Sequence, residues 1–313
     1  EDCPLNFKTA GKKLFPIAAA ALLAALACAG GSLAASFTDE TGRAVGLSPA
    51  PQRIISLAPG ITEILYALEL DNRITGVTTF CDWPAAARQK TKIGGFTNPS
   101  IEKIVALRPD LILATADGNR RETIEQLARL GLPVYVINPS SPRGVLTSIA
   151  GIGRITGREP QAQRLVSGLG QRLDAIAART GGFEKPRVFF QLGLEPMISA
   201  GRGTLIHEVI IAAGGINVAG GDLAHYPRYS AEGIIGAAPD IIVFAPMVND
   251  ENFKAVRAFW RNFPNVPAVQ NNRIYPIDAN LINRASPRIF DAVEILARLF
   301  HPEPAGRQTG ARR

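Results

Sequence analysis

The sequence contains very little cysteine. Three cysteines occur among 313 residues, and two of them, Cys3 and Cys28, lie before residue 34. A chain cut after Ala34 would keep only Cys81 and could form no internal disulfide. The mature fold must therefore be stabilised by packing and polar contacts alone.

Histidine is equally scarce, which limits metal binding. The three histidines are His207, His225 and His301. A zinc or manganese receptor built on several His ligands is therefore not expected. Cys81 together with His225 stays open as an alternative metal site, although a lone Cys is more often a small buried hydrophobe.

The usual catalytic signatures are missing. No G-x-S-x-G motif occurs, and the segment HEVII at residues 207–211 has Ile where a zinc protease motif needs its second His. The segment GIGRITG at residues 151–157 has the wrong last spacing for a dinucleotide loop and follows no predicted strand. We interpret it as small-residue helix packing or a break. The sequence predicts neither an enzyme nor a cofactor.

Positive charge is not concentrated in any one segment. The chain has 34 Lys and Arg against 27 Asp and Glu, a formal net charge of +7, and these charges are spread along the sequence. Such a distribution does not indicate a nucleic acid partner. With 46% hydrophobic residues the chain has apolar material for two cores, so we expect two domains.

The longest apolar run lies near the N-terminus. Two lysines precede an apolar segment at residues 14–29, and the small residues 32–34 follow it. This layout predicts a signal peptide at residues 1–34 and export to the periplasm or the extracytoplasmic face. The alternative is a retained anchor, but the run contains Pro16, is mostly Ala, and falls short of the roughly 20 apolar residues that a span requires.

A second interpretation of this region concerns Cys28. Residues 25–28, ALAC, form a degenerate lipobox with Ala where a larger aliphatic side chain is usual. Lipid attachment at Cys28 would tether the protein to a membrane surface. We favour simple cleavage and keep the lipoprotein as the alternative.

Two parts of the chain alternate short β-branched runs with amphipathic helical segments. Strands are predicted at 54–57, 74–77, 187–192, 241–244 and 274–277, and helices at 62–70 and 286–300. This alternation is typical of parallel α/β sheets. The sequence therefore predicts an α/β fold of two Rossmann-like lobes with mainly parallel sheets, at residues 35–153 and 183–302. A polar tail at 303–313 is expected to be disordered.

A long helix is predicted between the lobes. The segment has no strand signal, opens with Glu159 and Pro160, repeats apolar residues at helical spacing and stops at the glycines 181–182. About 20 residues at 1.5 Å each give a rod of roughly 30 Å. We expect residues 154–182 to form one stiff connecting helix.

An internal repeat supports two related lobes. The segment SIEKIVALRPDLIL at residues 100–113 matches SAEGIIGAAPDIIV at residues 230–243, at a constant offset of 130. Each copy predicts a short helix that buries one apolar stripe, ends at a Pro and leads into a buried strand. In the first copy this stripe comprises residues 101, 104 and 105.

Both copies carry a carboxylate in the first helical turn, Glu102 and Glu232. A carboxylate there complements the helix dipole, worth about 0.3 to 1 kcal/mol, and that role alone would suffice. The alternative is a pair of equivalent acidic groups, one per lobe, presented to a two-fold symmetric partner with basic sockets. The repeat by itself leaves both interpretations open.

Aromatic side chains gather in loops that follow predicted strands. These are Phe80, Trp83, Phe96, Tyr226 and Tyr229. Ligands of open α/β sheets bind beyond the carboxyl ends of strands and between domains. An aromatic cleft with few charges suits a wide, flat, partly apolar ligand better than an ion or a sugar.

Four motifs resemble the cobalamin-binding proteins of ABC importers. They are RIISLAP at 53–59, TEILYAL at 62–68, GVTTFCDWP at 76–84 and NRASPR at 283–288. The resemblance runs from about residue 51 to residue 300 and is specific for the helix-linked (class III) periplasmic binding proteins. It implies two lobes joined by one long helix, no chemical change to the ligand and a monomer that delivers to a dimeric ABC permease.

The resemblance also implies roles for particular residues. A Glu on each lobe of that family docks onto arginines of the permease, and Glu102 and Glu232 occupy the matching positions. Cobalamin or a related corrinoid is the expected ligand. Its expected contacts are Phe80, Asp82, Trp83, Phe96, Tyr226, Leu281 and Arg284.

The chain departs from the family pattern at two of these positions. Phe96 and Leu281 stand where cobalamin binders tend to place Trp. The alternative ligands are haem and ferric siderophores, whose receptors share the fold but would need more Arg or Tyr than Arg284, Tyr226 and Tyr229 supply. Metallocluster enzymes also share the architecture, yet they anchor clusters through several cysteines.

Overall fold

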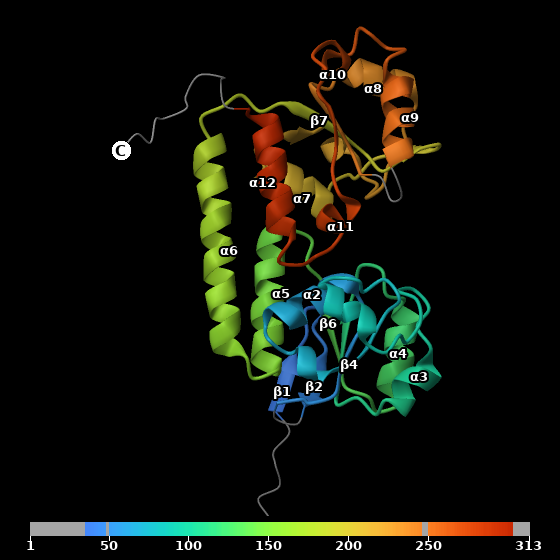
Figure 1. The fold of residues 1–313 in the computed structure, drawn as a ribbon, viewed down its shortest axis with the longest axis vertical. Coiled ribbons are helices and arrows are strands. Elements are labelled where there is room, and N and C mark those ends of the chain that lie inside the picture. The colour runs from blue at the N-terminus through green and yellow to red at the C-terminus, as the bar shows by residue number, and fades with distance from the viewer. Residues whose placement is uncertain (1–34, 48–49, 246–249, 303–313) are drawn as a thin grey trace, which may run out of the picture.

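The computed structural model describes residues 35–47, 50–245 and 250–302. The predicted signal peptide with Cys28, and the predicted tail at 303–313, lie outside these residues. Two four-stranded parallel sheets form two lobes, one above the other in Figure 1, with helices packed around each sheet. The predicted fold class is confirmed.

The N-terminal lobe is built on the sheet β4-β3-β5-β6, and all its neighbouring strands are parallel. Every residue of β5 and β6 is buried, as expected for a parallel sheet that is covered on both faces. An antiparallel hairpin, β1-β2, precedes this sheet. The elements are β1 (Ala35–Thr38), β2 (Ala44–Leu47), β3 (Ile54–Ser56), α2 (Pro59–Ala67), η1 (Asp71–Arg73), β4 (Ile74–Val77), η2 (Ala85–Gln89), α3 (Ile101–Ala106), β5 (Leu111–Thr115), α4 (Arg121–Arg129), β6 (Val134–Ile137) and α5 (Pro142–Ile155).

The C-terminal lobe repeats this plan on the parallel sheet β10-β7-β11-β12. A cluster of aromatic rings around Trp260, Phe189 and Phe259 fills one side of its core. The elements are β7 (Arg187–Gln191), β8 (Gly193–Leu194), β9 (Met197–Ile198), α7 (Leu205–Ala212), β10 (Ile216–Asn217), η3 (Val218–Gly221), α8 (Ala231–Ala237), β11 (Ile241–Phe244), α9 (Asp250–Trp260), α10 (Pro267–Gln270), β12 (Ile274–Pro276), α11 (Ala279–Ile282) and α12 (Ile289–Phe300).

The predicted strands coincide with β3, β4, β7, β11 and β12 to within one residue at either end. The predicted boundaries of the helices were less accurate. The helix predicted at 62–70 begins at Pro59, because Pro is favoured in the first helical turn, where its missing N–H costs nothing. The helix predicted at 286–300 begins at Ile289. No helix within the described residues is both long and apolar enough to cross a membrane.

A single long helix, α6 (Glu159–Thr180), runs alongside both lobes (Figure 1). Its 22 residues give a length of about 33 Å. Asp174 accepts a hydrogen bond from Arg143 of α5 at 2.7 Å. On the other side Arg172 donates to Asp291 of α12 at 2.7 Å and to Glu294 at 3.2 Å. The helix therefore contacts one helix of each lobe, while the predicted domain boundaries at 153 and 182 stay a prediction.

The glycine-rich segment 151–157 packs helices together, as one of its two interpretations proposed. Gly153 lies inside α5, and a Cβ atom there would overlap the Cβ of Ala162 in α6. Without a side chain at this position the two helices approach closely. The segment is not a dinucleotide loop, because it forms the C-terminal end of α5 and the turn before α6 and does not connect a strand to a helix.

The internal repeat is preserved in three dimensions. The side chains of Ser100 and Ser230 each cap their helix by accepting from the backbone N–H three residues later. Asp110 accepts from the backbone N–H of Arg53 at 2.8 Å, and Asp240 does the same from Arg187 at 2.8 Å. The two lobes therefore share one helix–strand unit, including its capping contacts.

The predicted apolar stripe of this unit was only partly right. Ile104 and its counterpart Ile234 are fully buried, but Val105 is 43% exposed. The reason is geometric, because residue 105 lies about 100° around the helix from residue 104 and α3 ends one residue later. The centre of each helix is buried and its flank remains in solvent.

We predict that Gly153→Ala lowers the free energy of unfolding by about 1 to 3 kcal/mol, because the new methyl group must push α5 away from α6. The matched control is Gly168→Ala, an exposed helical position of α6 with open space around it. There the substitution should stabilise by about 0.5 to 1 kcal/mol. Urea unfolding of both variants checks this, and equal effects would contradict close packing at residue 153.

Candidate functional site

A cleft of about 670 Å³ lies between the two lobes. The N-terminal lobe lines it with residues at or just beyond the carboxyl ends of β3, β4, β5 and β6, which are Ala58, Phe80, Thr115 and Ile137. The C-terminal lobe supplies the start of α7, the loop with Tyr226 and the segment 279–285 after β12. The cleft therefore sits at the carboxyl ends of the parallel strands of both sheets, where open α/β sheets bind ligands.

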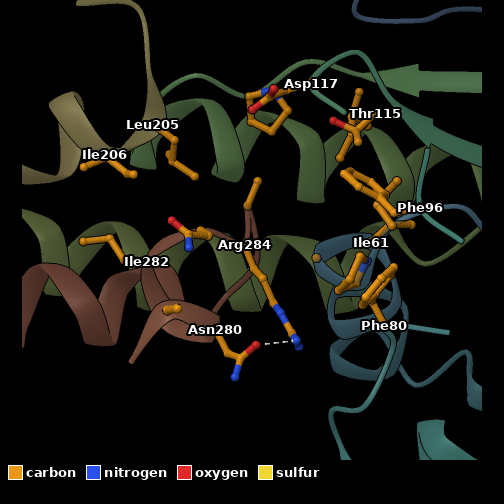
Figure 2. A pocket seen from close by; sticks show the side chains of 18 of the residues that line it. Ile61, Phe80, Phe96, Thr115, Asp117, Leu205, Ile206, Asn280, Ile282 and Arg284 are labelled. Carbon is orange, nitrogen blue, oxygen red and sulfur yellow. Dashed lines mark hydrogen bonds between the residues drawn. The ribbon is translucent and has the colours of Figure 1, made fainter. Parts of the chain in front are cut away.

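The walls of the cleft are mainly apolar. Phe80, Phe96 and Ile61 lie on one side in Figure 2, and Leu205 and Ile206 face them from α7. The volume falls within the usual range of about 300 to 1,000 Å³ for ligand pockets. A broad apolar molecule could be enclosed between these two walls.

Phe96 owes its position to a neighbouring glycine. Gly118 has a φ of +105°, and a Cβ atom there would overlap the Phe96 ring. The ring therefore lies directly over the backbone of the loop that follows β5. Asn119 fixes the same loop, because its side-chain amide donates to the backbone carbonyls of Leu57 at 3.0 Å and Phe96 at 2.8 Å.

The structure brings four of the seven predicted ligand contacts to the cleft: Phe80, Phe96, Tyr226 and Arg284. The other three do not line it. Asp82 accepts a hydrogen bond from Arg284, the Trp83 ring lies 4.4 Å from the guanidinium carbon of Arg288, and Leu281 packs against the hydrophobic core.

Arg284 is the centre of a polar network that joins the lobes. Its Nη1 atom donates to Oε1 of Glu63 at 3.0 Å and to Oδ1 of Asp82 at 2.7 Å, both in the N-terminal lobe. Its Nη2 atom donates to Oδ1 of Asn280 at 2.6 Å, the bond drawn in Figure 2. The Ser286 hydroxyl donates to the other oxygen of Glu63 at 2.7 Å.

Glu63 is the buried member of this network. It lies on α2 and is 5% exposed. Arg288 places a second guanidinium 3.5 Å from its Oε1 atom. A carboxylate this deeply buried is stable only when it is paired, and both of its cationic partners come from the opposite lobe.

The segment 283–288 reaches α2 because Gly60 leaves room for it. A Cβ atom on Gly60 would lie 2.6 Å from the carbonyl oxygen of Ala285. Any larger residue would separate the two lobes at this contact. The motifs PGITE on one lobe and NRASPR on the other are therefore complementary halves of one interface.

Asp82 and Arg284 keep their charges at neutral pH. Burial favours the neutral form of Asp82, but the hydrogen bond and charge of Arg284 outweigh it, so the pKa of Asp82 is lowered. Burial likewise opposes the charge on Arg284, whereas Asp82 and Glu63 raise its pKa. Asp82 thus favours the folded state above its unfolded pKa, and this contribution is lost as the pH falls through its folded pKa.

Sequence reasoning missed Glu63, Asn280 and Asp117 as members of the site. Asp117 lies two residues beyond the end of β5 and lines the cleft, so its position near a strand end was an available signal. Glu63 had no such signal, since its partners lie more than 200 residues away in the chain.

Cys81 is explained by local polar contacts. Its buried thiol lies 3.1 Å from the hydroxyls of both Thr62 and Thr78. Across the described ranges, no group of three or more His, Cys, Asp or Glu side chains is placed to hold a metal ion.

Glu102 and Glu232 lie on the surface, away from the cleft. They belong to α3 and α8, which Figure 1 places on the side of the molecule opposite α6, one on each lobe. Hydrogen bonds from the Ser100 hydroxyl and its own backbone N–H lower the pKa of Glu102. The corresponding bonds, from its own backbone N–H and Ser230, lower the pKa of Glu232. Both exposed groups are charged at neutral pH.

Two parallel α/β lobes, one long helix against both, and an apolar cleft between them define a helix-linked, bilobal binding protein. Residues 54–281 match the model of the periplasmic binding protein family. The chain belongs to this family.

Relatives of known structure or curated description share most of the chain. The vitamin B12-binding protein of Vibrio campbellii is 30% identical over 244 residues, which cover 77% of this chain and 86% of the relative. The solved periplasmic vitamin B12-binding protein of Vibrio cholerae is 29% identical with a TM-score of 0.73, covering 80% of this chain and 96% of that one.

A haem-binding relative is also similar. The periplasmic haem-binding protein of Roseiflexus is 26% identical with a TM-score of 0.70, covering 80% of this chain and 97% of that one. The described fold is therefore common to binding proteins for different tetrapyrrole-like ligands, and the lining of the cleft must distinguish them.

We predict that Glu63→Gln lowers the free energy of unfolding by about 1 to 3 kcal/mol, because it removes the buried charge that faces Arg284 and Arg288. Urea unfolding measures this, with Glu122→Gln as the control, an exposed Glu of α4 outside the network. An unchanged midpoint for Glu63→Gln would show that the charge of Glu63 is not needed to hold the two arginines in place.

Proposed function

We propose that this protein captures cobalamin or a related corrinoid outside the cytoplasm and delivers it unchanged to an ABC import permease. The observation that carries this is the apolar cleft between the lobes, walled by Phe80 and Phe96 at the carboxyl ends of the strands. The vitamin B12-binding relatives, which match nearly the full fold, support the choice of ligand.

The chemistry of the ligand agrees with that of the cleft. A corrin is a wide macrocycle with apolar faces and a fringe of neutral carboxamides. Aromatic side chains stabilise such faces through stacking and edge contacts, about 0.5 to 1.5 kcal/mol for each pair beyond the buried area. The amide fringe would find hydrogen-bonding partners in Asn280, Asn283 and Thr115.

Haem and ferric siderophores are the alternative ligands, and the haem-binding relative gives the first of them some support. Both carry anionic groups. Among the described residues that line the cleft, Arg284 is the one cation, and Glu63 and Asp82 already hold it. This arrangement favours a neutral fringe over carboxylates.

Within this proposal the protein is a carrier and not an enzyme, and it needs no cofactor. It acts as a monomer in the periplasm, released by cleavage after residue 34. Lipid attachment at Cys28 remains the alternative route to the same compartment. The layout of the N-terminal sequence and membership of the periplasmic binding protein family support this proposal.

Calorimetric titration of the mature protein with cyanocobalamin tests the ligand. We expect micromolar affinity or tighter, and a loss of about tenfold in Phe96→Ala because a cleft-lining ring is removed. The control is Phe183→Ala, an exposed ring that stacks on His301 outside the cleft.

No detectable heat for the unmodified protein, together with tight binding of haem or a ferric siderophore, would count against a corrinoid. An equal loss of affinity in Phe96→Ala and Phe183→Ala would count against stacking in the cleft.

The permease contact is the second part of the proposal. Glu102 and Glu232 are exposed, charged and equivalent under the internal repeat, with one on each lobe. A dimeric permease presents each basic socket twice, so one carboxylate per lobe matches its symmetry. Rim charges of this kind govern encounter and register more than ligand affinity.

We predict that the double variant Glu102→Arg with Glu232→Arg abolishes corrinoid uptake and leaves the affinity of the soluble protein unchanged, since both residues lie outside the cleft. Uptake of labelled corrinoid by cells or by reconstituted permease measures the first effect and calorimetry the second. The control, Glu122→Arg with Glu184→Arg, makes the same charge change on exposed residues of both lobes. Equal uptake by the two double variants would disprove docking at these sites.

A further inference from the structure

One carboxylate in the cleft has no partner among the residues that the structure describes. Asp117 follows β5, is exposed and lines the cleft. Figure 2 shows it beside Thr115, on the far side of the cleft from Asn280. In the part of the chain that the structure describes, its side chain makes no hydrogen bond and no ion pair.

The other charges at the cleft cancel. The cationic Arg284 pairs with the carboxylates of Glu63 and Asp82. The cationic Arg288 pairs with Glu63. Asp117 stands outside this network. The described lining of the cleft therefore carries one uncompensated negative charge.

The charge of Asp117 acts on a side chain on the other side of the cleft. Tyr226 belongs to the opposite lobe, and its pKa is raised first by burial and then by the charge of Asp117. The two side chains line the same cavity. A ligand that fills the space between the lobes would therefore also experience the field of Asp117.

We propose that Asp117 is a specificity-determining residue, which accepts hydrogen bonds from neutral amide N–H groups at the rim of the ligand and repels an ionised carboxylate in the same place. The proposal rests on the proposed corrinoid function and refines it. It assigns to this residue the discrimination between amide-fringed and acid-fringed macrocycles.

The physical basis is the difference in hydrogen bonding and charge between a carboxamide and a carboxylate of similar shape at the rim of the ligand. A carboxamide donates to a carboxylate, and hydrogen bonds to charged groups are stronger than neutral ones. A carboxylate in its place can donate nothing and places like charges together in a partly enclosed cleft, which disfavours binding. Selectivity then comes from a repulsive element as well as an attractive one.

Asp117→Asn isolates this effect, because Asn has nearly the same shape but is neutral and can donate to a carboxylate. The probes are cyanocobalamin, its derivatives with one carboxamide hydrolysed to a carboxylate, and haem, each titrated into the full mature chain. We expect the unmodified protein to prefer cyanocobalamin to at least one mono-acid by on the order of tenfold. In Asp117→Asn this preference should fall to about threefold or less, and haem should bind more tightly than to the unmodified protein.

The control is Glu122→Gln, which removes one negative charge from α4 outside the cleft and should leave every preference unchanged. If the unmodified protein binds cyanocobalamin and Asp117→Asn keeps the same preferences, the role of Asp117 is overturned while the proposed function stands. If the unmodified protein binds haem and not cyanocobalamin, both are overturned.

Discussion

The buried ion pair between Glu63 and Arg284 is the interaction on which the geometry of the cleft depends. One partner comes from each lobe, and Glu63 is almost fully buried, so neither charge can be left alone without a large desolvation cost. Gly60 allows the segment with Arg284 to touch α2, and α6 holds both lobes from the side. The spacing between the cleft walls follows from these contacts together.

The duplication of one helix–strand unit explains why the two lobes carry equivalent residues on their surfaces. Each copy keeps a Ser cap, a Glu in the first turn and an Asp that accepts a hydrogen bond from the backbone at the start of the neighbouring strand of the sheet. Capping and the helix dipole account for the local stability of both copies. The exposure and charge of both Glu side chains leave them available for a second role on the surface.

Much of the fold could be predicted from the sequence, because strands and the long helix are encoded by local periodicity. β4, β11 and α6 were placed from apolar spacing and from Pro and Gly at their ends. Phe80, Phe96 and Tyr226 could be predicted as cleft residues because they lie in loops that follow predicted strands, whereas Arg284 was predicted from the family resemblance alone. Glu63 could not, since a buried carboxylate on a helix signals its role only through partners in the other lobe. The predicted burial of Val105 was wrong for a different reason, because the sequence of a six-residue helix does not show how wide its buried face is.

The network that joins the lobes also limits what the cleft can recognise. Arg284 lines the cavity, yet its guanidinium already donates to Glu63, Asp82 and Asn280. An anionic ligand would have to compete with these carboxylates for it, and breaking the pair with Glu63 would leave a buried charge unpaired. The interaction that joins the lobes therefore works against acidic ligands, and a neutral, amide-fringed macrocycle is the class that the cleft can accept without disturbing it.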